Sequence, residues 1–450
     1  MQFGGAHGAL VGFSARRGVD LVARRVVPLV ARRAIGFTAL AMLVAAWSTA
    51  EPARAQAQAE PQGAAGPAPE GQQPPAEHGW ADGDHLTGDW GGARSALADR
   101  GVTIDVFYAS EAFTARGESS VLGHLDAAIT LDTHKLGLWD GGTLYALGQN
   151  NHGNSGITDA VGSAQPVTNL EAEPYTQLTE LFLEQTFLDE RIRIRIGKQD
   201  ANRDFGTPRF GGNFINNNFG MYPTSPLPSY PTTGLGALVA AQPVAWLTGK
   251  AGIYEGSPGI GGFGLTRAFQ SGNGYTLVGG AAATHHYGPA DRDGGTTSAG
   301  AWWQSGDFTE VGVAMPRSFE TNAGWFVQND ERIYLHPSDP DDPRGLTVIL
   351  RASWARPDRT PVTRYAGGSA AWHGIGPRHN DTVGLGAGTF RVAEPLGGSP
   401  GPGDEWFVEA FYKLRLTAFF SLQPDLQWFH HPGGDGADAL VAGLRVKVKL

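Results

Sequence analysis

Charged and branched apolar side chains alternate from Arg191 to Ile196, in a run that continues to Lys198 and reads Arg-Ile-Arg-Ile-Arg-Ile-Gly-Lys. In a helix of about 3.6 residues per turn the arginines would spread around the whole cylinder, whereas a strand collects alternate residues on one face. One face of this strand suits water or anionic partners, and the other suits hydrocarbon. The pattern is typical of a half-buried strand in a soluble sandwich or of a strand in the wall of a membrane channel.

The residues before this run predict the other strand of a hairpin. Leu178–Phe187 is a strand-like run, and 188–191 can form a tight turn centred on Asp189 and Glu190. The resulting register sorts both strands into a polar face and an apolar face, and a slip by one residue would destroy that sorting. On the polar face the register pairs Thr186 with Arg193, Glu184 with Arg195 and Phe182 with Gly197; on the apolar face it pairs Phe187 with Ile192, Gln185 with Ile194 and Leu183 with Ile196.

The N-terminal residues have the features of an export signal. Paired arginines precede the apolar stretch Ala34–Ala46, which is too short to span a bilayer. Ala53-Arg54-Ala55 offers a small-x-small cleavage site, Ser48-Thr49-Ala50 is a second candidate, and a retained membrane anchor is the alternative. We therefore expect residues 1–55 to be a cleaved signal peptide. The following residues, 56–85, are rich in Ala, Pro and Gln and predict a disordered linker.

Composition agrees with export and excludes one class of partner. The chain contains no cysteine, which fits a protein that avoids stray disulfides outside the cytoplasm. Seven of its 34 basic residues and two of its 44 acidic residues lie in residues 1–55. The remaining chain therefore has 27 basic and 42 acidic residues and a net charge of −15. A charge of this sign and size argues against binding to nucleic acid.

The remaining chain predicts a membrane barrel. Phe210–Gly249, its longest charge-free stretch, contains five prolines and cannot be a lipid-exposed helix. From Leu86 onward, alternating segments of about ten residues are separated by clusters of Gly, Asn, Asp and Pro, as in transmembrane barrels. We expect an all-β fold, a transmembrane antiparallel β-barrel over residues 86–450, with a short helix at Ala93–Arg100 that ends before Gly101. The clearest predicted strands are Val102–Ala109, Leu125–His134, Leu178–Phe187, Arg191–Gln199, Phe407–Leu416, Pro424–Phe429 and Leu440–Leu450.

Three segments resemble a known family in their order and spacing. They are Leu86–Arg94, Arg195–Asn202 followed by Phe205, and Leu422–Gln427 with Pro432-Gly433-Gly434. From about Leu86 to the C-terminus the chain resembles the OprB-type carbohydrate-selective porins. The resemblance implies an outer-membrane barrel of about 16 strands whose constriction is lined by charged side chains and passes glucose and other small sugars.

Passage of a sugar needs a narrow, hydrogen-bonding pore and no chemistry. Arginine and carboxylate suit this role because both form bidentate hydrogen bonds to vicinal hydroxyls. We predict that Glu180, Glu184, Arg193 and Arg195 line the pore and that Phe182, on the same face, is a stacking surface for sugar rings. The alternative is that these residues only stabilise the barrel wall. The twelve tryptophans are better explained as an interfacial belt.

The predicted protein is therefore a passive channel for small carbohydrates such as glucose, with no enzymatic activity, no cofactor and no metal. Three alternatives stay open: a general diffusion porin without sugar selectivity, a plugged structural or adhesive barrel, and a membrane-embedded hydrolase. The expected partners are small sugars, outer-membrane lipid and lipopolysaccharide, and the barrel-assembly machinery, which recognises a C-terminal strand. The sequence leaves monomer and trimer undecided.

Overall fold

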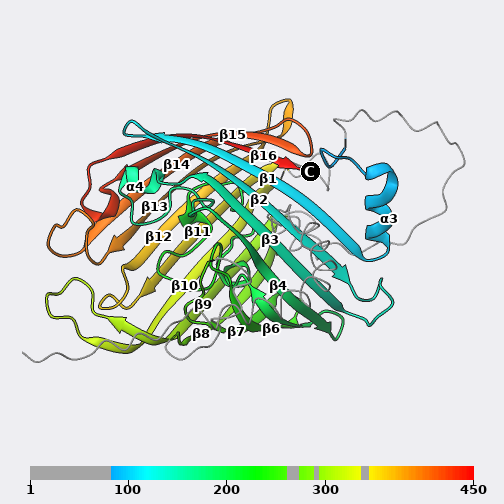
Figure 1. The fold of residues 1–450 in the computed structure, drawn as a ribbon, viewed down its shortest axis with the longest axis horizontal. Helices are drawn as coiled ribbons and strands as arrows, with labels where there is room; N and C mark the ends of the chain where they lie inside the picture. Colours follow the sequence, from blue (N-terminus) through cyan, green and yellow to red (C-terminus); the bar gives the residue numbers. More distant parts are fainter. Residues whose placement is uncertain (1–82, 261–272, 288–292, 336–343) are drawn as a thin grey trace, which may run out of the picture. The chain divides into compact units, whose positions relative to one another are not determined.

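The computed structural model describes residues 83–260, 273–287, 293–335 and 344–450. Within these ranges sixteen strands form one closed barrel (Figure 1). Each strand is antiparallel to its neighbours in the chain, and the first strand closes the barrel against the last. The predicted all-β barrel is confirmed. The predicted signal peptide lies outside the described residues, as does nearly all of the predicted linker.

Most of the strands are longer than the segments that predicted them. The bounds of the strands are β1 Val102–Ala115, β2 Glu118–Asp132, β3 Gly142–Asn154, β4 Tyr175–Phe187, β5 Ile192–Gln199, β6 Gly234–Val244, β7 Leu247–Glu255, β8 Tyr275–Tyr287, β9 Asp293–Thr309, β10 Ser318–Leu335, β11 Gly345–Ala355, β12 Val362–Ile375, β13 Arg378–Val392, β14 Gly403–Arg415, β15 Phe420–His430 and β16 Ala439–Lys449. Each of the seven predicted segments overlaps one strand, although β5 begins one residue later than predicted and β2, β14 and β16 end one or two residues earlier.

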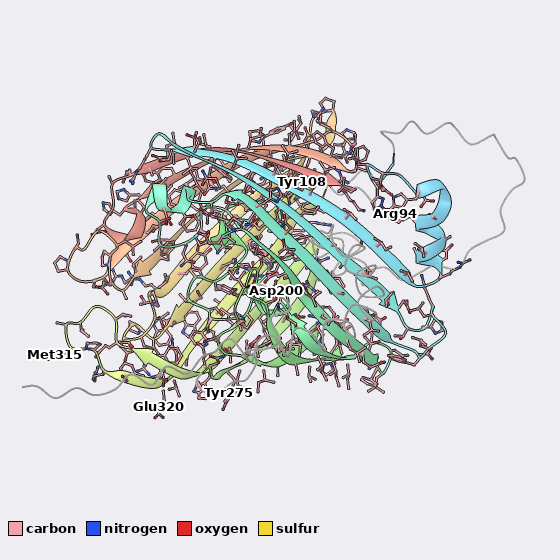
Figure 2. The ribbon with its side chains drawn as sticks, viewed as in Figure 1. Arg94, Tyr108, Asp200, Tyr275, Met315 and Glu320 are labelled. Carbon is pink, nitrogen blue, oxygen red and sulfur yellow. The ribbon has the colours of Figure 1, made fainter. Side chains whose placement is uncertain are left out.

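A short helical segment precedes the barrel, as predicted. The 3-10 turn η2 (Trp90–Gly92) leads into α3 (Ala93–Asp99), and Gly101 follows with a φ of +87°. Glycine is favoured there because a left-handed backbone carries no Cβ penalty. Arg94 ties this segment to the barrel: its guanidinium donates to the carbonyl oxygen of Leu450 at 2.9 Å. Figures 1 and 2 show α3 and Arg94 beside the C-terminal end of the chain.

The predicted hairpin register is confirmed pair for pair, with Glu184 opposite Arg195 and Phe187 opposite Ile192. Its two faces have opposite environments. Ile196 points outward and is 60% exposed, while Phe182 and Arg195 are each 4% exposed. The apolar face is therefore the outer face of the barrel wall, and the polar face points into the lumen.

Two long loops between strands fold against the inner wall. The β3–β4 loop (residues 155–174, which contain α4, Ile157–Val161) donates from Thr168 to Glu111 on β1 at 2.7 Å. The β5–β6 loop (residues 200–233) contains α5 (Asn202–Phe205) and η3 (Asn217–Phe219). A backbone hydrogen bond of 2.8 Å from Asn169 to Ile215 joins the two loops. Among the described residues, no helix combines the length and the apolar character needed to cross a membrane.

Aromatic side chains fill the space between the β5–β6 loop and the far wall. Phe214 packs edge-on against Phe411 of β14, and Phe219 packs against Phe407, with ring centroids 5.0 Å and 5.4 Å apart. Gly386 of β13 makes room for this contact, because a Cβ there would lie 2.4 Å from the Phe219 ring. Part of the lumen is thus an apolar core that fixes the loop.

Candidate functional site

The candidate site is a group of charged side chains, here called the arginine cluster, formed by Glu184, Arg193, Arg195, Asp204 and Lys250. Arg193 donates to Glu184 Oε2 at 3.1 Å and to Asp204 Oδ1 at 2.7 Å. Arg195 donates to the same two carboxylates, from Nε to Glu184 Oε2 at 2.8 Å and from Nη1 to Asp204 Oδ2 at 2.6 Å. Each arginine therefore bridges a wall carboxylate to a loop carboxylate.

Period-two alternation and strand pairing bring the wall members together. Arg193 and Arg195 are two residues apart on β5 and share its inner face, and Glu184 lies directly opposite Arg195 on β4. Asp204 arrives from α5, in the loop that follows β5 directly. Lys250, on β7, donates to the backbone carbonyl of Asp204 at 2.7 Å. The cluster thus joins three strands to the inward loop.

Exposure divides the cluster into an inner layer and an outer layer. The side chains of Arg195 and Asp204 are only 5% and 4% exposed. The side chains of Lys250, Arg193 and Glu184 are 24%, 23% and 16% exposed, so a solute in the lumen can reach them. Burial alone would raise the pKa of Asp204, but Arg195, Arg193 and Lys250 outweigh it and hold that pKa below its usual range. The Asp204 carboxyl is therefore ionised, and the five groups carry a net charge of +1.

Phe182 lies beneath this cluster. Its ring is 4% exposed and packs on Tyr145, with centroids 4.9 Å apart. The guanidinium carbon of Arg195 lies 4.7 Å from the centre of the same ring. Tyr145 thus supports the Phe182 ring, and the guanidinium of Arg195 lies over that ring, an arrangement that favours a cation.

Glu180 anchors the start of the inward loop. It is 2% exposed and pairs with Arg203 of α5. Its Oε2 also accepts from the backbone N–H of Asp200 at 3.3 Å. Figure 2 shows Asp200 inside the outline of the barrel. Of the five residues predicted to line the pore, three belong to the arginine cluster, and the other two, Glu180 and Phe182, support it from the wall.

Sequence reasoning did not find Asp204, Lys250 or Arg203. Arg203 and Asp204 lie in the loop after β5, between the Asn202 and Phe205 of the family resemblance. The long span to the next strand could have pointed to them. Between the end of β5 and the start of β6 lie 34 residues, 200–233, longer than an ordinary barrel turn. Lys250 lies on a strand that was not among those predicted from the sequence.

The β5–β6 loop is held at its far side by buried side chains of the opposite wall. Arg351 of β11 donates to the carbonyl oxygens of Asn218 at 3.1 Å and Gly206 at 2.6 Å. Glu409 of β14 accepts from the backbone N–H groups of Ile215 at 2.7 Å and Asn216 at 2.9 Å. The loop therefore crosses from the arginine cluster to the opposite wall, and it narrows the lumen.

Comparison with known proteins decides the family. The sequence profile described as "Carbohydrate-selective porin, OprB family" matches residues 116–450. The chain belongs to the OprB family. Its barrel is that of an outer-membrane porin of the carbohydrate-selective type, as the sequence resemblance implied.

Relatives of this OprB-family protein cover most of its length. It is 22% identical over 418 residues to the putative porin QuiX of Acinetobacter baylyi, which covers 81% of this chain and 93% of that protein. It is 21% identical over 422 residues to Porin B of Pseudomonas aeruginosa, covering 80% and 90%. The high-pH structure of Pseudomonas putida OprB has the same fold, with a TM-score of 0.72 at 18% identity over 83% of this chain and 100% of the other.

Proposed function

We propose that this OprB-family porin passes small neutral sugars such as glucose by passive diffusion, and that the arginine cluster is the point where the sugar contacts the wall. Glu184, Arg193 and Lys250 touch the solute, because their side chains are the exposed parts of the cluster. Arg195, Glu180 and Phe182 hold them in place. The observation that carries this proposal is the double bridge of Arg193 to Glu184 and Asp204.

The cluster suits a neutral polyol for two reasons. Its guanidinium and carboxylate groups offer donors and acceptors at fixed positions, which can partly replace the water around sugar hydroxyls. Its net charge is small, so it does not create the strong single-sign field that would select ions. Because the charged groups are already paired with one another, a sugar competes for hydrogen bonds rather than gaining them freely. Binding is therefore weak, and the sugar can leave again.

A general diffusion porin is the alternative. It would use the same barrel, but the arginine cluster would only fix the loop. Liposome swelling distinguishes the two functions, using purified full-length protein with glucose and with a zwitterionic amino acid of similar size. The proposal predicts faster swelling in glucose than the size of the two solutes explains. Equal rates would leave a pore without sugar preference.

We also propose that the protein reaches the outer membrane through a signal peptide at residues 1–55, with the linker at 56–85 preceding the barrel domain at 86–450. N-terminal sequencing of the protein purified from outer membranes tests this directly. We expect the mature chain to begin at Gln56. A chain that begins at Met1 would contradict cleavage.

A further inference from the structure

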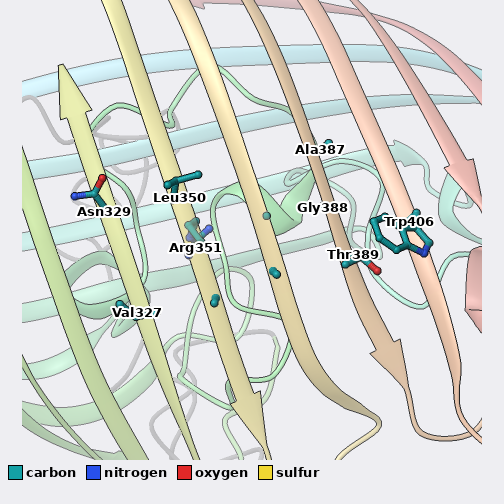
Figure 3. Close-up of a pocket in the computed structure, with 11 residues that line it drawn as sticks. Val327, Asn329, Leu350, Arg351, Ala387, Gly388, Thr389 and Trp406 are labelled. Atoms are coloured by element: carbon teal, nitrogen blue, oxygen red, sulfur yellow. The ribbon is translucent and has the colours of Figure 1, made fainter. Parts of the chain in front are cut away.

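A shallow apolar groove lies on the outer face of the barrel, across β10 to β14. Its volume is about 520 Å³. One cross-strand row forms its centre, because the register places Trp406 opposite Thr389, Thr389 opposite Ala366, Ala366 opposite Ala352, and Ala352 opposite Val327. Figure 3 shows Leu350 and Trp406 on either side of small residues. Leu350 and Trp406 are 57% and 51% exposed, so the groove opens outward and not into the lumen.

A second row on the same face borders the groove. Two residues further along each strand the register places Asp404 opposite Arg391, Arg391 opposite Arg364, Arg364 opposite Trp354, and Trp354 opposite Trp325. We call these five residues the charged row. Since side chains two residues apart share a face of a strand, the charged row and the groove form one continuous surface.

Charges in this row are incompletely balanced. Arg391 forms a bidentate pair with Asp404, at 2.9 Å and 2.7 Å. Arg364 reaches the same carboxylate at 3.3 Å, and its side chain is 57% exposed. Two arginines directly opposite each other repel, and one carboxylate serves both. The three groups carry a net charge of +1, which an added anion would compensate.

The lengths of the loops place the charged row near the extracellular surface of the outer membrane. Loops 155–174, 200–233 and 393–402 all join an odd-numbered strand to the next even-numbered strand and so lie at one end of the barrel. In bacterial barrels the longer loops are extracellular, and aromatic side chains mark both interfaces. Arg391 and Asp404 flank loop 393–402, and Trp325 and Trp354 continue their row. The groove extends from that row toward the membrane interior.

We propose that this surface binds lipid A of the outer leaflet, with a phosphate at Arg364 and Arg391 and an acyl chain in the groove. Guanidinium groups form strong bidentate hydrogen bonds to phosphate, and Asp404 holds Arg391 in position for them. Alanine and glycine at the groove floor let a chain lie close to the strands. A lipid with two phosphates and several acyl chains meets both requirements at once. The site is separate from the lumen and independent of sugar passage.

Native mass spectrometry of the purified full-length protein tests the proposal, with bisphosphorylated lipid A, dephosphorylated lipid A and phosphatidylglycerol as probes. We expect the unmodified barrel to retain one lipid A in preference to the other two. The double variant Arg364→Gln/Arg391→Gln should bind lipid A at least about tenfold more weakly. Arg317→Gln is the matched control, because Arg317 is a 70% exposed arginine paired with Glu310 in an extracellular loop.

A separate substitution tests the role of the groove. Ala366→Trp fills its centre and should also weaken retention of lipid A, whereas Ala251→Trp, on the outer face of β7, should not. Ion conductance in planar bilayers confirms that each variant is folded, and we expect it to be unchanged. Unaltered lipid A binding in both the double variant and Ala366→Trp would overturn the proposal. Equal binding of phosphatidylglycerol at these residues would overturn the assignment to lipid A.

Discussion

Glu184 and Arg195 lie directly opposite each other on β4 and β5, and the guanidinium Nε donates to Glu184 Oε2 at 2.8 Å. On the barrel wall alone this would be an ordinary cross-strand ion pair. It becomes part of a larger site because Asp204, from the inward loop, accepts from the same guanidinium. A pair that is fixed by strand register thus also fixes the position of a loop inside the lumen.

Asp204→Asn should loosen the inward loop and destabilise the barrel. The substitution leaves Arg193, Arg195 and Lys250 with one carboxylate, and breaking a buried pair in this way costs about 3–5 kcal/mol. Thermal unfolding in detergent measures the loss, and single-channel recordings should show larger current fluctuations. Asp189→Asn, in an exposed turn, is the control and should behave like the unmodified protein. Identical behaviour of both variants would mean that Asp204 does not hold the loop.

Arg351→Ala should release the far side of the loop. Its guanidinium is buried and donates to two loop carbonyls, each such charge-assisted hydrogen bond contributing about 1.5–3 kcal/mol. We expect a higher single-channel conductance, because the loop can then leave the lumen. Arg359→Ala is the matched control, since Arg359 donates to the carbonyl oxygen of Thr321 outside the inward loop at 2.8 Å. A conductance that is equal in the two variants would speak against anchoring by Arg351.

Gly386→Ala tests the aromatic packing without changing a charge. The new methyl group would lie 2.4 Å from Phe219 and 3.0 Å from Phe214, so the loop must shift. Overpacking of this kind costs about 1–3 kcal/mol. Gly249→Ala is the control, because nothing lies within 4 Å of a Cβ at that position. We expect a lower Tm for Gly386→Ala alone; a Tm equal to that of the control would contradict the packing.

Asp200 should make the stability of the protein depend on pH. It lies in the loop beyond β5, and burial, aided by the charge of Glu180, raises its pKa from 3.8 to about 6. The folded state then binds the proton more tightly than the unfolded state does. The free energy of unfolding therefore decreases as the pH rises from about 4 to about 6, and Asp200 causes no further change above that range. Asp200→Asn should therefore gain thermal stability relative to the unmodified protein at pH 7 but not at pH 4. An equal difference at both pH values would rule out this titration.

The sequence was sufficient to predict the barrel, because several alternating strands with charges on one face follow a predicted export signal. It also predicted the hairpin register, because the length of the turn and the separation of polar from apolar faces require the same pairing, with Phe187 opposite Ile192 and Glu184 opposite Arg195. It did not predict which loop fills part of the lumen. Loop 200–233 has no periodic pattern, so neither its path nor the contact of Asp204 with Arg195 could be inferred from spacing. Strand alternation places Phe407 and Phe411 on the inner face of β14 with Glu409. It does not predict that Phe214 and Phe219 of the loop pack on them.

Contact between sugars and the arginine cluster can be measured as the block of ion current by glucose in planar bilayers. The two proteins to compare are the unmodified protein and Arg193→Ala/Arg195→Ala. The double substitution leaves Glu184 and Asp204 with Lys250 as the remaining cation of the cluster, so we expect a less stable barrel that still conducts. The net charge of the cluster changes from +1 to −1, so selectivity should shift toward cations. We expect millimolar glucose to reduce the current of the unmodified channel and this block to be weakened about tenfold or more in the double variant. An equal block in both proteins would contradict contact between sugars and the cluster.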